Sequence, residues 1–424
     1  MTQVVVVGGG LSGCGAALAA VKAGAEVTLL ERTDMLIGLA LRSGETNGNG
    51  RFVGQHELRF LGGGELFDAL KSIKLHDDVE FPGVFKHTYI FNTGLAEPLI
   101  KRMVNEAGVK VRLENRVVDV KKEGSRILAV KSEDGSLVEG DAFIDCTGSR
   151  GGVSVCTKYG KGCLMCLIRC VAFGDPVGIV GKAGGKELNR LRPDGKPGMV
   201  ASGILVYKDT LSPSLKARIE KEGVVGVPLP SELVDYSKVG LMNAGRSKDH
   251  VEKLIVSDIG PVAKCSGIVY ITQEQLRMVP GFENAQMEDP RSSKYNHIAG
   301  IAIAERDNSM KVEGFENLFC AGEKSGHTGI DPAIITGYLA GHNAARSTFK
   351  RELLVLPTSL AIGDWIAYVA ERYKTEEGLK KNYQMSWGEY WERMQELGLY
   401  TDDVSQIKSR VEKTGLLGIL SRKM

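Results

Sequence analysis

The sequence has little net charge and lacks the motifs of several large enzyme classes. Lys and Arg together number 54 and Asp and Glu 52, for a formal charge of +2. Nucleic acid could therefore bind only through a local basic patch. No P-loop, Ser-His-Asp pattern or zinc-protease motif occurs. Six of the histidines show no metal-ligand spacing such as HxxxH: His56, His76, His87, His297, His327 and His342.

A long uncharged stretch, residues 4–21, is rich in glycine and alanine and has no basic segment before it. It therefore predicts neither a membrane span nor a secretory signal, and we expect a cytoplasmic protein. The 424 residues predict about two to three domains, and no internal repeat is visible. Eight cysteines in a reducing compartment favour metal or redox chemistry over a disulfide framework.

The amino-terminal segment has the pattern of a dinucleotide site. Four valines, 4–7, predict a buried strand, and Gly8, Gly10 and Gly13 follow with GxGxxG spacing. Such glycines allow a tight turn, close approach of a pyrophosphate, and packing of a helix on a strand. The helix amino terminus would then bind the phosphates. Glu31 ends the second strand, where it can accept hydrogen bonds from a ribose; the alternative is an ordinary βαβ unit. Candidate cofactor-binding residues here are Gly8, Gly10, Leu11, Ser12, Gly13, Glu31 and Arg32.

Later segments favour FAD as the dinucleotide. Short strands are predicted at 109–113, 116–121, 126–132 and 137–144, the last running into Thr147-Gly148. This arrangement resembles flavoproteins of the glutathione-reductase type. Residues 317–323 resemble that family's second FAD motif, in which an acid binds the ribityl chain. The family more often has Asp than Glu there, and a solvated acid is the alternative. The resemblance adds Val118, Thr147, Gly148, Gly322 and Glu323 as FAD-binding candidates.

Asp331-Pro332 predicts the start of a helix that runs to about Thr348. Asp is a preferred N-cap, and Pro suits the first helical position. In the fold proposed here this helix points its amino terminus at the flavin ring. Its dipole would favour negative charge on the reduced ring, and Asp331 is a cofactor-binding candidate.

Four cysteines lie within fifteen residues with the spacing C-x6-C-x2-C-x3-C: Cys156, Cys163, Cys166 and Cys170. The last three match the tail of a ferredoxin-type ligand run, and glycines around them leave the chain free to wrap an inorganic core. Four thiolates without a nearby histidine suit soft metals. We expect these residues to ligate an iron–sulfur cluster of the 4Fe-4S type. Structural zinc and redox or buried thiols are the alternatives.

Other candidates carry weaker signals. Cys14, Cys146, Cys265 and Cys320 lie in apolar or glycine-rich contexts and are expected to be packing residues. Residues 43–50 read as a mobile loop that could cover the flavin. His327 is the histidine expected nearest the flavin. The block 182–196 has five basic and two acidic residues and could touch RNA, although an exposed charged loop is the favoured interpretation.

The carboxyl-terminal residues 351–424 predict helices. Residues 364–369 are amphipathic, helix starts are expected at Thr375 and Ser386, and 405–413 is a further helix. Three tryptophans lie in this region and could anchor a partner, although core packing is the default: Trp365, Trp387 and Trp391.

Several separated blocks resemble one subgroup of flavoproteins, the glucose-inhibited division protein A family and the folate- and FAD-dependent tRNA uracil methyltransferases. Besides the two flavin motifs, they are 162–163 with 173–178, 275–285 and 356–368. The block 275–285, Gln-Leu-Arg-Met-Val-Pro-Gly-Phe-Glu-Asn-Ala, is the most specific. The blocks follow the family's order and span nearly the whole chain.

The resemblance implies that Cys163 works beside the flavin, as the matching cysteine does in the methyltransferases. The family block continues with Pro and Glu, whereas this chain has Leu164, Met165 and Cys166. Because thiols replace polar residues, the sequence favours electron transfer over methyl transfer.

We therefore predict an α/β protein with a glutathione-reductase-type, two-dinucleotide-binding (Rossmann-like) FAD fold, an inserted α+β substrate domain and a helical carboxyl terminus. The FAD-binding domain comprises 1–150 and 301–350, the inserted cysteine-cluster domain 151–300, and the helical region 351–424.

The predicted function is that of an FAD-dependent oxidoreductase whose flavin takes two electrons and passes them singly through the iron–sulfur centre. Folate- and FAD-dependent methylation of tRNA uracil is the first alternative, and a non-catalytic FAD-binding subunit the second. No second GxGxxG is present, so NAD(P)H would visit only as a transient donor. We expect a small-molecule or protein redox partner and a homo-oligomer or complex, with RNA a less favoured partner. No residue is assigned as catalytic.

Overall fold

A computed structural model describes most of the chain. The described residues are 2–46, 48–81, 85–148, 178–202, 204–236, 249–266, 272–288 and 296–424. Cys156, Cys163, Cys166 and Cys170, and the predictions made for them, lie outside these residues.

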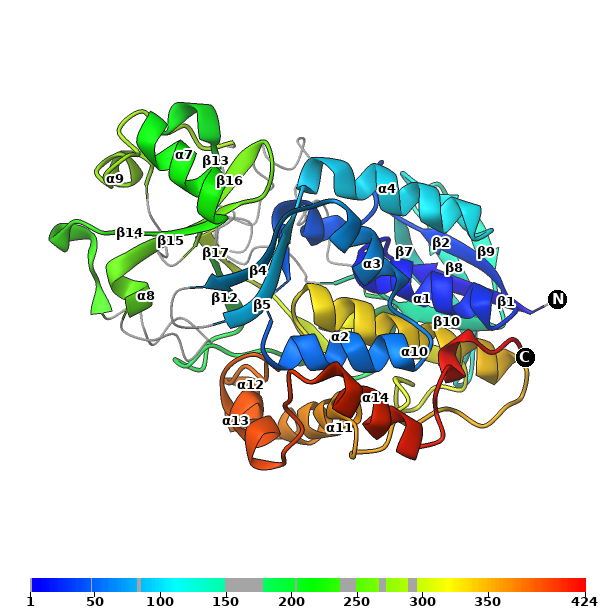
Figure 1. The fold of residues 1–424 in the computed structure, drawn as a ribbon. Helices are drawn as coiled ribbons and strands as arrows, with labels where there is room; N and C mark the ends of the chain where they lie inside the picture. The colour runs from blue at the N-terminus through cyan, green and yellow to red at the C-terminus, as the bar shows by residue number, and fades with distance from the viewer. Residues whose placement is uncertain are drawn as a thin grey trace.

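A five-stranded parallel sheet in the order β19-β10-β1-β2-β6 forms the centre of the first domain (Figure 1). Its strands are β1 (Gln3–Val7), β2 (Glu26–Leu30), β6 (Lys110–Arg112), β10 (Ala142–Asp145) and β19 (Leu318–Cys320). Val4 to Val6 are fully buried because both faces of the sheet are covered. Since β19 pairs with β10, the second predicted FAD motif joins the same sheet as the first.

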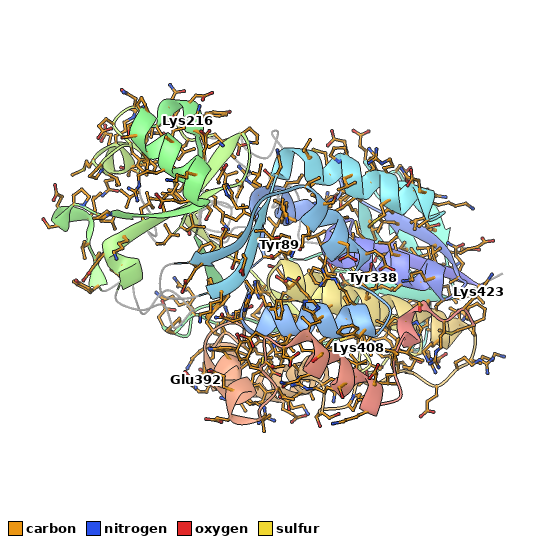
Figure 2. The ribbon with its side chains drawn as sticks, in the orientation of Figure 1. Tyr89, Lys216, Tyr338, Glu392, Lys408 and Lys423 are labelled. Atoms are coloured by element: carbon orange, nitrogen blue, oxygen red, sulfur yellow. The ribbon has the colours of Figure 1, made fainter. Side chains whose placement is uncertain are left out.

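Helices α1 (Leu11–Lys22) and α10 (Ile330–Thr348) pack against each other on one face. Their backbones nearly touch: a Cβ at Gly341 would lie 2.0 Å from the Ala16 carbonyl oxygen, and one at Gly337 2.3 Å from that of Ser12. Tyr338 of α10 lies inside this packing, whereas Lys408 and Lys423 lie on outer elements (Figure 2). Helix α4 (Thr93–Glu106) also packs on this core.

An antiparallel meander covers the other face of the sheet. It consists of β7 (Val117–Glu123), β8 (Arg126–Ser132) and β9 (Leu137–Glu139), whose apolar residues pack on Val5 and Val7 of β1. The prediction of a single strand over 137–144 is wrong. A turn at Gly140-Asp141 splits it, so that β9 pairs with β8 while β10 pairs with β1. The Asp141 carboxylate accepts from Gln3 N (2.8 Å) and holds this turn against β1.

A second antiparallel sheet, in the order β13-β16-β15-β14, has its own core. The strands are β13 (Ile204–Tyr207), β14 (Val224–Pro228), β15 (Lys253–Asp258) and β16 (Val262–Ser266), accompanied by helices α7 (Pro213–Glu222), α8 (Asp249–Glu252) and α9 (Gln273–Arg277). Leu215, Ile219, Leu276 and Phe282 fill that core. The specific block 275–285 therefore begins in α9 and continues into the same core.

A three-stranded sheet that the sequence did not predict connects the two parts. It has the order β3-β5-β4, with β3 (Glu45–Thr46), β4 (Lys74–Phe81) and β5 (Phe85–Phe91). Phe81, Phe85 and Ile90 share a small core with Leu205 and Ile255 of the second sheet. The remaining short elements are α6 (Ile179–Lys182) and the pairs β11 (Glu187–Asn189) with β18 (Ala302–Ala304) and β12 (Met199–Ser202) with β17 (Asn296–Ala299).

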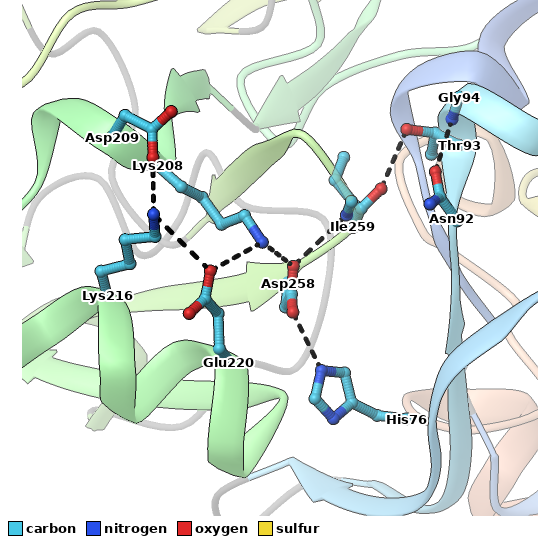
Figure 3. Close-up of polar contacts among 11 residues, drawn as sticks. His76, Asn92, Thr93, Gly94, Lys208, Asp209, Lys216, Glu220, Asp258 and Ile259 are labelled. Atoms are coloured by element: carbon cyan, nitrogen blue, oxygen red, sulfur yellow. Dashed lines mark hydrogen bonds and ion pairs between the residues drawn. The ribbon is translucent and has the colours of Figure 1, made fainter.

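Polar contacts reinforce this junction (Figure 3). Asp258, at the end of β15, accepts from Lys208 Nζ (2.8 Å) and lies 3.0 Å from His76 Nε2 on β4. The next residue, Ile259, accepts at its carbonyl oxygen from Thr93 Oγ1 (3.0 Å) and Thr93 N (3.1 Å), at the start of α4. The inserted sheet is thus fixed to two elements of the first domain.

The carboxyl-terminal residues form helices, as predicted, beneath α2 (Gly50–Phe60) and α10 (Figure 1). They are α11 (Ala361–Arg372), α12 (Glu376–Leu379), α13 (Glu389–Glu396) and α14 (Val404–Lys413), while α3 (Glu65–Ser72) precedes β4. Thr375 caps α12 as expected, but Ser386 starts no helix, because α13 is preceded by Gly388 in a positive-φ conformation that favours glycine.

The three carboxyl-terminal tryptophans all make internal contacts. Trp365 is fully buried, Trp387 packs 5.0 Å from the ring of Phe85, and Trp391 packs 4.7 Å from that of Tyr400. Within the described ranges, no helix combines the length and apolar character that crossing a membrane requires.

Candidate flavin site

The predicted glycine motif forms a cradle between β1 and α1. Gly8 has φ +104°, and a Cβ there would lie 2.4 Å from the Cys146 carbonyl oxygen. A Cβ at Gly13 would lie 1.8 Å from the Gly8 carbonyl oxygen, so helix and strand touch at this point. At Gly10, by contrast, no atom lies within 4 Å of the Cβ position. Packing thus requires glycine at positions 8 and 13, whereas Gly10 faces open space.

The amino terminus of α1 borders the open space at Gly10. Gly10 is its N-cap and contributes no side chain to cap the helix, so the first amides of α1 are available to an anion. Leu11 and Ser12, both buried, form the first turn. This arrangement fits a pyrophosphate.

Glu31 lies beside the cradle at the end of β2. Its carboxylate accepts from Gly9 N (2.7 Å) through one oxygen and from Thr33 N (2.9 Å) through the other. The side chain is buried, and these two hydrogen bonds fix its orientation. Arg32, the next residue, is exposed. Contact of either residue with a ribose stays a prediction.

The remaining FAD-motif residues reach the same edge of the sheet. Thr147 donates from N (3.1 Å) and Oγ1 (2.7 Å) to Asp145 at the end of β10. A Cβ at Gly148 would lie 3.8 Å from the Glu323 carboxylate, and one at Gly322 would lie 3.0 Å from Ser12 Oγ. The structure therefore brings together three segments that are far apart in the sequence. Val118 lies half-buried in a bulge of β7, away from regular pairing.

Helix α10 starts differently from the prediction. Its N-cap is Gly329, at φ +117°, and Asp331 lies in the first turn, fully buried. The prediction of Asp331 as N-cap is wrong, because its carboxylate points to α2, where Gln55 Nε2 donates to it (2.5 Å) and Arg51 lies 3.6 Å away. Burial raises the pKa of Asp331, and Arg51 opposes that shift. The predicted end of the helix, Thr348, is confirmed.

His327 has the environment of a core histidine. It is almost fully buried, its Nδ1 lies 2.9 Å from Ser325 Oγ, and its ring meets that of Trp365 edge-on at 4.4 Å. Burial, together with the nearby charge of Arg306, holds the pKa of His327 well below its usual range. The ring is therefore neutral, and the geometry favours packing over catalysis.

The described residues of 43–50 pack closely against other segments, and a role in covering the flavin stays a prediction. A Cβ at Gly48 would lie 1.5 Å from the Lys86 carbonyl oxygen, and one at Gly50 2.1 Å from that of Met385. Asn49 Oδ1 accepts from Lys86 N (3.0 Å). The glycines here permit close backbone packing.

The four remaining cysteines are buried and free, as predicted: Cys14, Cys146, Cys265 and Cys320. Burial raises the pKa of Cys14 and of Cys320 to about 12, so both are neutral packing residues. Among the described residues, no group of three or more His, Cys, Asp or Glu side chains is arranged to hold a metal ion.

The basic block 182–196 is only partly a solvated surface. Arg190 is buried, and its guanidinium donates to Tyr373 Oη (2.8 Å). Arg192 pairs with Asp194 (3.1 Å), and Lys186 pairs with Glu305 (2.5 Å). Much of this charge therefore has a structural role.

Two residues next to the site, Arg51 and Gln55, were missed by sequence reasoning. Both lie on α2 and contact Asp331 from there. No local pattern marks them, because only the packing of α2 against α10 brings them to the site.

Two family models match the chain. One, described as FAD dependent oxidoreductase, matches residues 3–153, and the other, glucose inhibited division protein A, matches residues 266–352. Together with the parallel sheet and the cradle at its edge, these matches define the class: a flavoprotein of mixed α/β architecture with an FAD-binding, Rossmann-like fold. The predicted fold class and the prediction of FAD as cofactor are confirmed.

Within this class the chain resembles the GidA and TrmFO group, as the sequence blocks predicted. The structure of Aquifex aeolicus GidA aligns with 97% of this chain and 76% of its own, with a TM-score of 0.67 and 16% identity. The methylenetetrahydrofolate–tRNA-(uracil-5-)-methyltransferase TrmFO of Thermosipho melanesiensis is 30% identical over 109 residues. The tRNA uridine 5-carboxymethylaminomethyl modification enzyme MnmG of Chlorobaculum tepidum is 33% identical over 111 residues. Each of these two sequence alignments covers 26% of this chain. They cover 24% of the TrmFO relative and 17% of the MnmG relative.

Proposed function

We propose that the protein is an FAD-dependent enzyme that modifies carbon 5 of a uridine in RNA, and that tRNA is its substrate. The observation that carries the proposal is the GidA-like fold over 97% of the chain, which includes the inserted sheet and the carboxyl-terminal helices. The names of both groups of sequence relatives specify uracil or uridine, position 5, and tRNA. These comparisons support RNA modification better than the electron-transfer function that the cysteine spacing favoured.

The residues of the cradle would hold the cofactor. Gly10 leaves space for the pyrophosphate, Glu31 is placed to bind a ribose, and Glu323 is placed to bind the ribityl chain. Bound FAD would supply two-electron transfer. By the resemblance of the family block, Cys163, which lies outside the described residues, would work beside the flavin.

The test is direct. Protein loaded with FAD is incubated with an unmodified tRNA transcript, methylenetetrahydrofolate and NAD(P)H, and the digested RNA is analysed by mass spectrometry. We expect 5-methyluridine, and we expect Cys163→Ala to abolish it while the flavin absorbance is retained. Fully flavinated protein that leaves every uridine of the transcript unchanged would contradict methylation. If no electron donor reduces the flavin, the result would favour the interpretation as a non-catalytic FAD-binding subunit.

A second candidate is electron transfer through an iron–sulfur centre. The spacing of Cys156, Cys163, Cys166 and Cys170 favours it. Anaerobically purified protein should then contain iron and acid-labile sulfide and show a long-wavelength absorbance that dithionite bleaches. Metal-free protein from such a preparation would eliminate this candidate.

The cellular setting belongs to the same proposal. We place the protein in the cytoplasm, where tRNA is found. A redox partner, a transient NAD(P)H donor and assembly into an oligomer stay proposals, which copurification and light scattering can test.

A further inference from the structure

We propose that Arg51 and Asp331 form a buried charge pair that sets the reduction potential of the bound flavin, Arg51 raising it and Asp331 lowering it. The inference rests on the FAD binding in the proposed function and goes beyond it by assigning two positioning residues. Neither is a member of the glycine cradle.

The pair lies at the amino end of α10, next to the second FAD motif. Gly322 N donates to Thr336 Oγ1 (2.9 Å), and a Cβ at Gly322 would lie 3.9 Å from Ala333 Cβ. The first turns of α10 are therefore directly behind the motif. A Cβ at Gly329 would lie 2.8 Å from a terminal nitrogen of Arg51, so the guanidinium is pressed against the N-cap of α10.

The two charges are buried and only loosely matched to each other. Arg51 is 3% exposed and Asp331 is 0% exposed, yet their closest nitrogen and oxygen are 3.6 Å apart. Arg51 Nε and Asp331 Oδ2 have no hydrogen-bond partner among the described residues. Arg51 instead donates to Gln384 and lies over the ring of Trp387 (4.9 Å), and Gln55 donates to Asp331.

Such an arrangement lowers the stability of the fold. A buried polar atom without a partner lowers stability, and native proteins tolerate few of them. In a low-dielectric interior, charges act over longer distances than they do in water. A cation and the positive end of a 19-residue helix together favour negative charge nearby, and the carboxylate opposes both. Reduction of the flavin adds electrons and is therefore sensitive to both residues with opposite sign.

The opposite signs make the test specific. Arg51→Met and Asp331→Asn are purified with FAD, and the midpoint potential of each is measured by equilibration with a reference dye. We expect Arg51→Met to shift the two-electron equilibrium towards the oxidised flavin at least tenfold, which is about 30 mV. We expect Asp331→Asn to shift it towards the reduced flavin.

Arg410→Met is the matched control. Arg410 of α14 pairs with Glu57 (3.3 Å), which lies six residues after Arg51 on the same helix α2, and the loss of Arg410 should leave the potential unchanged. Arg51→Lys, which keeps the charge, should stay close to wild type.

A purely structural pair predicts a different result. Both variants would lose stability, and their flavin potentials would be unchanged or would move in the same direction; either result overturns the proposal. If Arg51→Met does not fold, Asp331→Asn decides, because an unchanged or lowered potential would refute the idea. A wild-type protein that holds no FAD would refute the proposed function, and this inference with it.

Discussion

Gly10 and Gly13 belong to one motif, but at the scale of single residues their surroundings predict opposite phenotypes. Gly13→Ala would place a methyl group 1.8 Å from a carbonyl oxygen and should destabilise the apoprotein by about 1–3 kcal/mol. Gly10 has φ −64°, which alanine adopts, and open space around its Cβ position. Gly10→Ala should therefore keep the stability of the apoprotein but bind FAD at least tenfold more weakly.

Urea unfolding without FAD and a fluorescence titration with FAD separate the two effects. Each variant serves as the control for the other. If Gly10→Ala bound FAD as tightly as the wild type, the open space at Gly10 would not receive the cofactor.

His342 makes stability depend on pH. It is fully buried on α10, and neither ring nitrogen has a hydrogen-bond partner within the described part of the chain. Burial, aided by Arg346 and Lys22, lowers its pKa to about 4, against about 6.5 in an unfolded chain. Between these values the unfolded state binds more protons, so stability decreases as the pH falls.

The expected loss from this one group is about 2 kcal/mol between pH 7 and pH 5. His342→Gln removes the titration, and its stability difference between the two pH values should shrink by that amount. Urea midpoints of variant and wild type at both pH values measure this. An unchanged difference would show that the pKa of His342 is the same in the folded and the unfolded state.

At the scale of elements, Glu57 connects three helices. From α2 its carboxylate accepts from Ala361 N and Ile362 N (2.9 Å each) at the start of α11, and it pairs with Arg410 of α14. Glu57→Ala would leave the helix amides and the Arg410 charge without their partner. We expect a loss of about 3 kcal/mol in the free energy of unfolding.

Hydrogen exchange should then increase in α11 and α14 before it increases elsewhere. Glu377→Ala is the control, because Glu377 is exposed and its change should stay within about 0.5 kcal/mol. Exchange that rises uniformly over the protein would contradict a local capping role.

At the scale of the whole molecule, Asp258 holds the inserted sheet to the first domain (Figure 3). Asp258→Ala would remove the contacts to Lys208 and His76 while leaving the separate core of the inserted sheet intact. We expect about 3 kcal/mol lower stability, because two partners lose a buried carboxylate. Hydrogen exchange should increase at β4 and β15.

Asp209→Ala is the comparison for this experiment. Asp209 pairs with Lys216 on the surface of the insert alone, so its loss should change stability by less than about 0.5 kcal/mol. If hydrogen exchange in Asp258→Ala also increases throughout the core of the inserted sheet, the inserted sheet and its junction with the first domain unfold as one cooperative unit, which contradicts the prediction.

The sequence by itself determined the elements whose signals are local. The glycine spacing predicted the cradle, the turn residues predicted the meander strands β7 and β8, and the apolar contexts of four cysteines predicted their burial. In each case, turn chemistry and periodicity act between residues close together in the chain. The family blocks added FAD and the likeness to GidA.

Only the tertiary structure decided the rest, because the deciding neighbours are distant in sequence. The local sequence around Gly48 and Gly50 predicts a mobile loop, whereas in the structure the backbones of Lys86 and Met385 pack closely against these two glycines. The local sequence predicts Asp331 as an N-cap, whereas in the structure its carboxylate contacts Arg51 and Gln55 of α2. A local pattern states what a residue can do, whereas long-range packing selects which of those possibilities has the lowest free energy.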